Sequence, residues 1–303
     1  MSEPIYADFL NHLPPELRPG DFMGTMQWAS DYDPKSLVYK QCFVGMIDIL
    51  GYRQLIQSTG SDSPEAIFTR VLNAFSWAKS SNASIQVSLF SDTLILATAD
   101  SEPVSFWQLA GIIQRFRMQL LEYGYLIRGA VALGPHFDLK GIWISPCLIR
   151  AYQLESSTAV VSRVLIDRPA LDCASAPIQQ DTNGAFGIPH QKLFVRINPE
   201  QVIRDYDNFF VLDLYSDSIE LRYLKTGVHP DAKNLNQERI DHCVKAGNDL
   251  LQKYRTGLKL ARERATDTKA QTKVEYLVQR WNAYCSNFVL ESELARDYRI
   301  QNV

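Results

Sequence analysis

The sequence predicts an α+β fold in which helices cover an antiparallel sheet and a helical extension follows. Over residues 41–168, short apolar runs bounded by turn residues alternate with longer segments of helical periodicity. Two of those runs flank a tight turn at Ser91 and Asp92, as the strands of a β-hairpin do. Near the C-terminus two apolar stripes recur at helical spacing. The chain of 303 residues is 46% hydrophobic, which excludes disorder as its dominant state.

The core is expected to begin after an N-terminal arm, residues 1–40, which is rich in Pro and has no sustained period. A short apolar run that ends at Gly51 is typical of a buried strand. The next segment has helical spacing and opens with Ser63 as N-cap and Pro64 in the first turn. The expected order is strand, helix, two hairpin strands, helix, strand, short helix and strand, at residues 41–50, 64–79, 84–90, 93–99, 104–123, 125–134, 145–154 and 159–167.

A loop-like composition over residues 168–191 predicts that the first domain ends near Arg168. The predicted units are therefore the arm, a catalytic domain over 41–168 and an extension over 169–303. Within the extension we expect strands near 192–197 and 208–214, then helices whose stripes span 240–261 and 274–288.

Composition and charge narrow the function classes. A formal net charge of -3 gives no general affinity for nucleic acid or anionic membranes. No apolar run approaches the roughly 20 residues of a membrane span, and the first residues lack the features of a signal peptide, so a cytoplasmic protein is expected. The five Cys are expected to be reduced structural thiols, and the five His show no metal-ligand spacing.

Asp48 and Asp92 are the most informative residues, because each follows a predicted strand at its end. Antiparallel neighbours would bring the two carboxylates together, where they repel unless a cation binds between them. Mg²⁺ or Mn²⁺ prefers oxygen ligands and often links carboxylates to substrate phosphates. Asp also caps turns, and the spacing alone leaves both interpretations open.

Four segments, in this order, resemble the class III nucleotidyl cyclases. "FVGMIDILGYRQL" resembles the first metal-binding strand, "VSLFSDTLILAT" the second metal motif and "YLIRGAVALG" a later strand of that family. "GIWISPCLIRAYQLE" with "VVSRVLID" is similar to its last helix and strand. The resemblance covers about residues 41–168, and four linked segments are more specific than any one of them.

The resemblance implies a role for each matching residue. Asp48 and Asp92 would hold two divalent ions, Mn²⁺ or Mg²⁺, and the carbonyl of Ile49 would be a further ligand. Arg128 would bind the triphosphate and Arg53 would add positive charge. Backbone N–H groups at the start of the following helix, residues 51–54, would face phosphate oxygens.

Several positions depart from the purine-specific members of that family. Ser88 stands where they carry a base-selecting Lys, and Tyr52 replaces a Phe beside the nucleotide. Ile149 and Gln153 stand in place of their transition-state Asn and Arg, and Arg150 is a substitute one position away. With the C-terminal "KVEYLVQRWNAY", this combination resembles the bacterial pyrimidine cyclases of the Pycsar antiphage system.

That resemblance implies a cyclase that converts UTP to 3′,5′-cyclic UMP and pyrophosphate. It also implies a homodimer, because class III sites lie between two catalytic domains, and a separately encoded effector that detects the product. No nucleic acid or membrane partner is expected. Three alternatives stay open: a cytidylate cyclase acting on CTP, a non-catalytic module that senses nucleotides, and an adenylate or guanylate cyclase with unusual base contacts.

Overall fold

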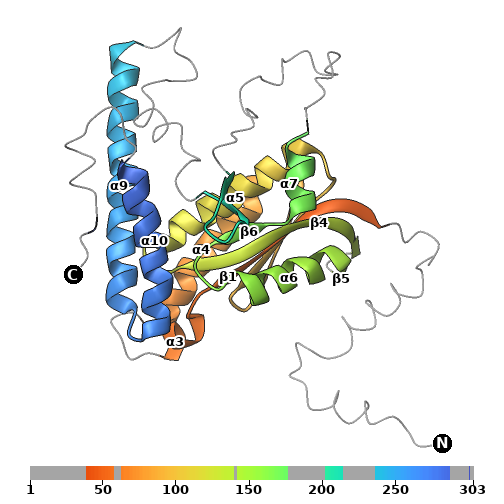
Figure 1. Ribbon diagram of the computed structural model, residues 1–303, viewed down its shortest axis with the longest axis horizontal. Coiled ribbons are helices and arrows are strands. Elements are labelled where there is room, and N and C mark those ends of the chain that lie inside the picture. The colour runs from red at the N-terminus through yellow and green to blue at the C-terminus, as the bar shows by residue number, and fades with distance from the viewer. Residues whose placement is uncertain are drawn as a thin grey trace, which may run out of the picture. The chain divides into compact units, whose positions relative to one another are not determined.

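One eight-stranded sheet forms the centre of the computed structural model (Figure 1). The structure describes residues 39–57, 63–139, 142–176, 202–213, 236–286 and 300. The strands are β1 Lys40–Ile49, β2 Ile85–Phe90, β3 Thr93–Thr98, β4 Ile127–Leu139, β5 Ile142–Ile144, β6 Val164–Ile166, β7 Val202–Arg204 and β8 Phe210–Leu212. Their order is β2-β3-β1-β4-β6-β8-β7, and β5 pairs with β4. All neighbours are antiparallel except β4 and β6.

Helices cover both faces of this sheet. The helices are α3 Tyr52–Gln57, α4 Pro64–Ser81, α5 Pro103–Leu121, α6 Pro146–Thr158, α7 Arg168–Ala174, α9 Gln237–Arg264 and α10 Thr268–Ser286. Figure 1 shows α4, α5 and α7 on one face and α6 on the other. The predicted N-cap of α4 is present, since Ser63 Oγ accepts a hydrogen bond from the Ala66 N–H at 3.2 Å.

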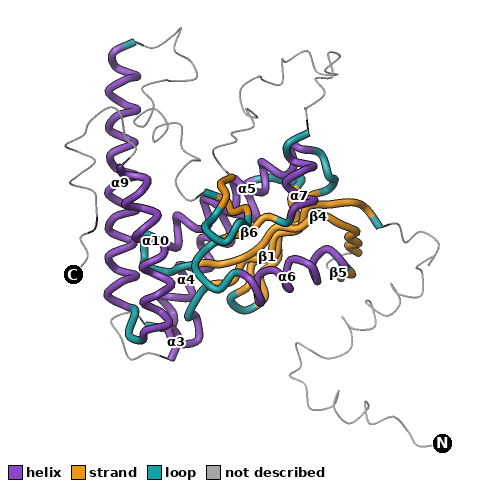
Figure 2. Tube along the Cα trace, in the orientation of Figure 1, coloured by secondary structure: helices purple, strands orange, loops and turns teal. Residues whose placement is uncertain are grey.

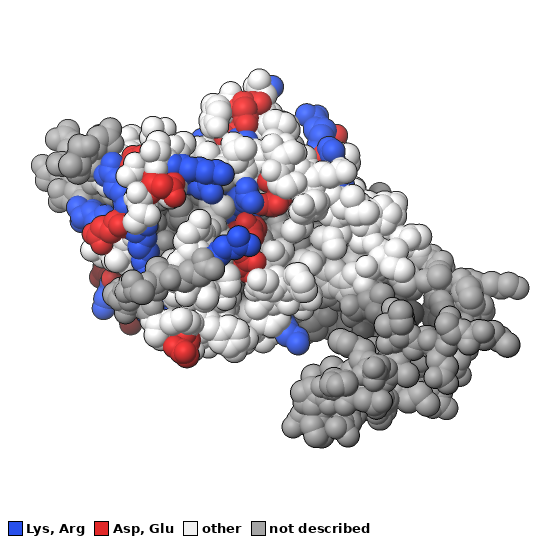
Figure 3. All heavy atoms as spheres, turned by 90° about the horizontal axis from the view of Figure 1, so that it is seen from below, with Lys and Arg blue, Asp and Glu red and all other residues white. Residues whose placement is uncertain are grey.

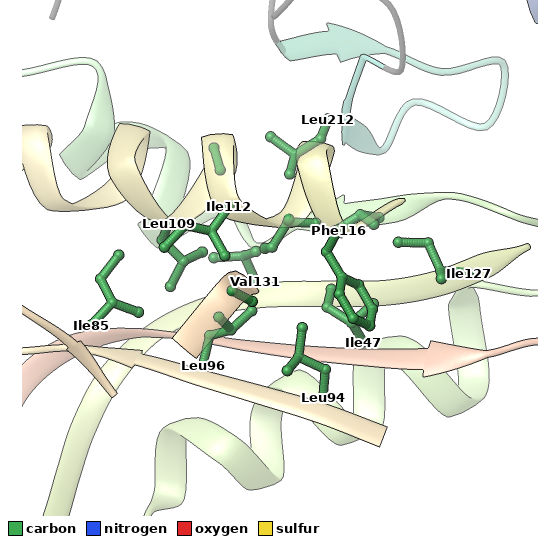
Figure 4. Close-up of a cluster of buried hydrophobic side chains, with 14 of the residues drawn as sticks. Ile47, Ile85, Leu94, Leu96, Leu109, Ile112, Phe116, Ile127, Val131 and Leu212 are labelled. Carbon is green, nitrogen blue, oxygen red and sulfur yellow. The ribbon is translucent and has the colours of Figure 1, made fainter. Parts of the chain in front are cut away.

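The larger core lies between the sheet and α5. Figure 4 shows Leu109 and Phe116 of α5 pointing toward Leu94, Leu96 and Ile47 of the sheet, and all five side chains are fully buried. Side chains alternate along a strand, so Val44 and Met46 of β1 face α6, where a smaller apolar cluster lies. By the same alternation, Asp48 belongs to the α6 face of the sheet.

The C-terminal helices α9 and α10 form a hairpin packed against the same structure (Figure 2). Their core includes Trp281, which is fully buried, and it also takes in Leu121 at the end of α5 and Leu126 before β4. At Gly257 a Cβ atom would lie 2.1 Å from the backbone oxygen of Leu121, so α9 approaches closely only because this residue lacks a side chain. The sheet also continues past residue 168 through β7 and β8.

The α+β fold and the helix-covered sheet are confirmed, with differences in detail. The predicted strand over 159–167 is reduced to β6, because the chain turns just before it, where the Arg163 N–H bonds to the Val161 carbonyl at 2.8 Å. The predicted loop from residue 168 begins with α7, which Asp167 caps and a Pro in the first turn favours. Residues 1–38 of the predicted arm and the strand near 192–197 lie outside the described residues. None of the described helices has the length and apolarity to cross a bilayer.

Candidate active site

Asp48 and Asp92 lie at the same edge of the sheet, as expected. β1 pairs with β3 in antiparallel register, with Asp48 opposite Thr93. One residue on, the Ile49 N–H donates to the Asp92 carbonyl at 3.1 Å. Asp92 lies in the tight turn between β2 and β3, where Ser91 takes a positive φ of 58°. The local hydrogen bonding therefore holds both aspartates and the Ile49 backbone beside one another.

The electrostatics of this pair suit a bound cation. Burial raises the pKa of Asp48, and the negative charge of Asp92 raises it further, against the opposing effect of Arg128. A divalent ion bound between the carboxylates would offset both the burial of the Asp48 charge and its repulsion by Asp92. In the described ranges, no group of three or more His, Cys, Asp or Glu side chains could by itself hold a metal ion. Two carboxylates and one carbonyl fit Mg²⁺, which keeps water and substrate phosphate oxygens as its other ligands.

Arg128 lies directly across from Asp48 on β4 and links it to α6. The register pairs the two residues, and the Arg128 Nε lies 3.3 Å from Asp48 Oδ2. The same Nε lies 2.6 Å from Oε1 of Glu155, a buried residue of α6. Burial raises the pKa of Glu155, which Arg128 opposes. Asp48, Arg128 and Glu155 thus form a charged row on the α6 face.

Glu155 is a site residue that the sequence reasoning missed. Its signal was present: it follows Cys147 and Ala151 at intervals of four, so it lies on the buried stripe of its helix. A carboxylate at such a position needs a buried partner. The chain position of that partner, 27 residues earlier on β4, follows only from the fold.

The two predicted base contacts point to different sides of the sheet. In β2, Ile85 and its alternate neighbours pack on the α5 side, so Ser88 faces the α6 side with Asp48. Tyr52 packs against the core on the α5 side. Burial is the main cause that raises the pKa of Tyr52, and the negative charge of Asp92 raises it further.

The other two predicted arginines lie at the surface. Arg53 is exposed on α3. Arg150 on α6 makes a bidentate ion pair with Asp167, from Nε at 3.1 Å and Nη2 at 3.0 Å. The positions of the expected transition-state residues, Ile149 and Gln153, are exposed on the same helix.

Comparisons with known proteins gave structural likenesses only. No family model matches the chain, and no curated protein matches it. Among solved structures, the chain is similar to the guanylyl cyclase Cya2, with 11% identity over 46% of this chain and 81% of that one and a TM-score of 0.36. It is also similar to a bacterial light-regulated adenylyl cyclase, with 10% identity over 52% of this chain and 55% of that one and a TM-score of 0.37. A third is a class III adenylyl cyclase-like ATP-binding protein from Pseudomonas aeruginosa, with 16% identity over 48% of this chain and 38% of that one and a TM-score of 0.35.

Proposed function

We propose that this chain is a nucleotidyl cyclase that converts UTP to 3′,5′-cyclic UMP and pyrophosphate. The observation that carries the proposal is the placement of Asp48 and Asp92 at one sheet edge, with Arg128 paired to Asp48 on the same face. The motifs that hold these three residues are those that resemble class III cyclases. Two carboxylates beside a guanidinium suit a substrate that carries both metal ions and phosphates.

In this proposal Asp48, Asp92 and the Ile49 carbonyl would hold two divalent ions. Such ions lower the pKa of a substrate hydroxyl and offset charge on a triphosphate. The two aspartates also orient the substrate, so that its 3′-oxygen attacks the α-phosphorus in line with the leaving pyrophosphate. The hydroxyl proton passes to water as the bond from the 3′-oxygen to the α-phosphorus forms. The bond between the α-phosphorus and the oxygen that bridges to the β-phosphate breaks, and pyrophosphate leaves with that oxygen. Arg128, which lies beside Asp48 on the neighbouring strand β4, donates hydrogen bonds to the triphosphate.

The choice of a pyrimidine rests on Ser88. Its short side chain faces the α6 side with Asp48, where a long basic side chain would be needed to select a purine in the resembled family. A hydroxyl both donates and accepts, so it pairs with the edge of either uracil or cytosine. We propose UTP as substrate, with CTP as the alternative. Tyr52, on the other side of the sheet, acts on the base only if the nucleotide reaches the Asp92 turn.

We further propose that two copies form a homodimer with equivalent sites. Four large apolar side chains are at least half exposed around α6: Ile144, Ile149, Tyr152 and Val160. Figure 3 shows few charged side chains over this part of the surface. A second copy would cover these side chains. The cyclic product would act as a second messenger in antiphage defence, detected by a separately encoded effector.

A second candidate is a module that binds nucleotides without turning them over. The observation that favours it is the ion pair of Arg150 with Asp167, which occupies the arginine that neighbours Ile149 on α6. Ile149 and Gln153 supply no charge there. In that case the aspartates would bind a metal–nucleotide complex for sensing.

The test is to incubate the purified protein with Mn²⁺ and each of ATP, GTP, CTP and UTP, and to identify products by chromatography and mass spectrometry. Cyclic UMP is the expected product. Cyclic CMP alone would support the cytidylate alternative, and a cyclic purine would overturn the role given to Ser88. Nucleotide binding without any product would favour the sensing module.

A further inference from the structure

A pocket of about 430 Å³ lies between the end of β1 and the C-terminal helical hairpin. On one side it is lined by the turn after β1, including Leu50 and Gly51, and on the other by Arg264, Lys269 and Lys273 of the hairpin. Leu50 follows directly after Ile49, whose carbonyl belongs to the proposed metal site. The hairpin therefore borders the active site, although its helices begin almost 190 residues after Asp48 in the sequence.

Positive charge is in excess in this pocket. Its one acidic lining residue, Asp267, caps α10 by accepting the Ala270 N–H at 2.7 Å. Arg264 lies over the ring of Tyr125, 5.0 Å from its centroid. Lys269 and Lys273 make no hydrogen bond or close ion pair with any part of the chain that the structure describes. Among the described residues, no carboxylate therefore lies within ion-pair distance of these two ammonium groups, and the charge of Asp267 acts on Lys273 only from across the same pocket.

Lys273 lines the same pocket as Leu50 and Gly51, which follow directly after the β1 residues of the proposed metal site. The charges of Asp48 and Arg128 both act on it, and it acts in turn on Asp48. Burial is the largest cause that lowers its pKa, and the neighbouring cations Arg128 and Lys269 lower it further. An anion placed between Lys273 and Arg128 would relieve this repulsion.

Two contacts that α10 makes within one turn after Lys273 help to fix its position. One turn later, the Tyr276 hydroxyl donates to Asp205 Oδ2 at 2.7 Å, which ties α10 to the loop between β7 and β8. Glu275 is paired with Arg262 of α9 at 2.7 Å. Lys273 therefore lies on a helix segment that is attached to the rest of the protein by these two contacts.

We propose that Lys273 binds the terminal phosphates of the nucleoside triphosphate, with Lys269 as a weaker second contact at the mouth of the pocket. The inference rests on the proposed function, because it assigns a further substrate contact to the same site. It makes the C-terminal hairpin part of that site. An ammonium is a suitable phosphate donor, since it acts as a compact point charge with three N–H groups.

The test compares Lys273→Gln with wild type in equilibrium binding of α,β-methylene analogues of the four nucleoside triphosphates. Their P–C–P bridge prevents release of pyrophosphate, so binding is measured without turnover. Lys273→Gln should weaken the best-bound analogue at least about tenfold, as loss of a charged hydrogen bond does, and leave binding of the matching monophosphate unchanged. Lys259→Gln is the matched control, because Lys259 is exposed on α9 outside the pocket.

Equal affinity of Lys273→Gln and wild type for the analogue would overturn the inference, as would a wild type that binds no triphosphate. An equal loss for the monophosphate would also overturn it, because the lost contact would then not involve the terminal phosphates. If Lys273→Gln does not fold by circular dichroism, Lys269→Gln provides the same comparison, with an expected loss of about threefold. Failure of the proposed function is distinct: Lys273-dependent triphosphate binding would persist while wild type forms no cyclic product.

Discussion

Removing the hydroxyl of Tyr276 is expected to weaken the attachment of α10 to the sheet. That hydroxyl donates to Asp205, whose carboxylate is buried and also accepts from Arg163 at 2.7 Å. Arg163 is itself buried and reaches a second carboxylate, Asp207, at 2.5 Å. In Tyr276→Phe the ring remains and one hydrogen bond to a buried charge is lost. Asp205 keeps its pairing with Arg163, so the charge is not left without a partner.

The magnitude follows from the kind of bond removed. Hydrogen bonds to charged groups contribute about 1.5 to 3 kcal/mol, so Tyr276→Phe should lower the free energy of unfolding by about 2 kcal/mol. Urea unfolding followed by circular dichroism measures this difference. A matched control is Tyr206→Phe, because Tyr206 is 72% exposed and lies 6.3 Å from the Tyr276 ring. The control should change stability by less than about 0.5 kcal/mol.

The pH dependence gives a second measure of the same contact. Burial and the bond to Asp205 raise the pKa of Tyr276 above its ordinary value. A tyrosine with a raised pKa favours the folded state below the unfolded value of about 10, and this stability is lost as the pH rises above it. The difference in the free energy of unfolding between wild type and Tyr276→Phe should therefore become smaller above about pH 10. A loss under about 0.5 kcal/mol at pH 7 would refute the account of how α10 is held.

Three further predictions test other contacts. Gly257→Ala should lower the free energy of unfolding in urea by about 2 to 3 kcal/mol, because the new Cβ would clash with the Leu121 oxygen. At Gly111 in α5 a Cβ would meet nothing within 4 Å, so Gly111→Ala should raise that free energy by about 0.5 to 1 kcal/mol. Equal effects of the two substitutions would contradict the close approach of α9. Burial raises the pKa of Cys147 to about 12, so about one thiol in 10⁴ is ionised at pH 8. Mass spectrometry should therefore find Cys147 alkylated far more slowly than the partly exposed Cys173. Equal alkylation rates would argue against a buried Cys147 thiol. Arg163 holds the pKa of Asp207 below its ordinary value. Asp207→Asn should therefore lower the free energy of unfolding fully at pH 7, and this loss should become smaller below about pH 4. A loss in urea unfolding that does not change with pH would contradict the pairing.

The sequence predicted the elements that depend on local pattern. The apolar run before Gly51 became β1, and the Ser91–Asp92 turn became the β2–β3 hairpin. Asp48 and Asp92 meet because β1 also pairs with β3, which the sequence allowed but did not determine. The helix at Arg168 was missed because Pro and small residues were interpreted as a loop, although Asp167 is an N-cap signal.

Contacts between distant parts of the chain were not predictable in this way. Tyr276 and Asp205 are 71 residues apart, and no periodic pattern in the sequence indicates that their side chains form a hydrogen bond. The same holds for Lys273, which the sequence places only at the start of the helical segment "KVEYLVQRWNAY". Pairings of this kind depend on how α10 packs against the sheet, which local propensity does not determine.

In the proposed function, Asp48 and Asp92 form the metal-dependent centre of a cyclase. The most direct measurement is the rate of cyclic UMP formation from UTP and Mn²⁺ by wild type, Asp48→Asn and Asp92→Asn, with Asp172→Asn as an exposed control. We expect product from wild type and the control, and a loss of at least about 100-fold in both site variants while their circular dichroism is unchanged. Full turnover by either site variant would contradict the claim.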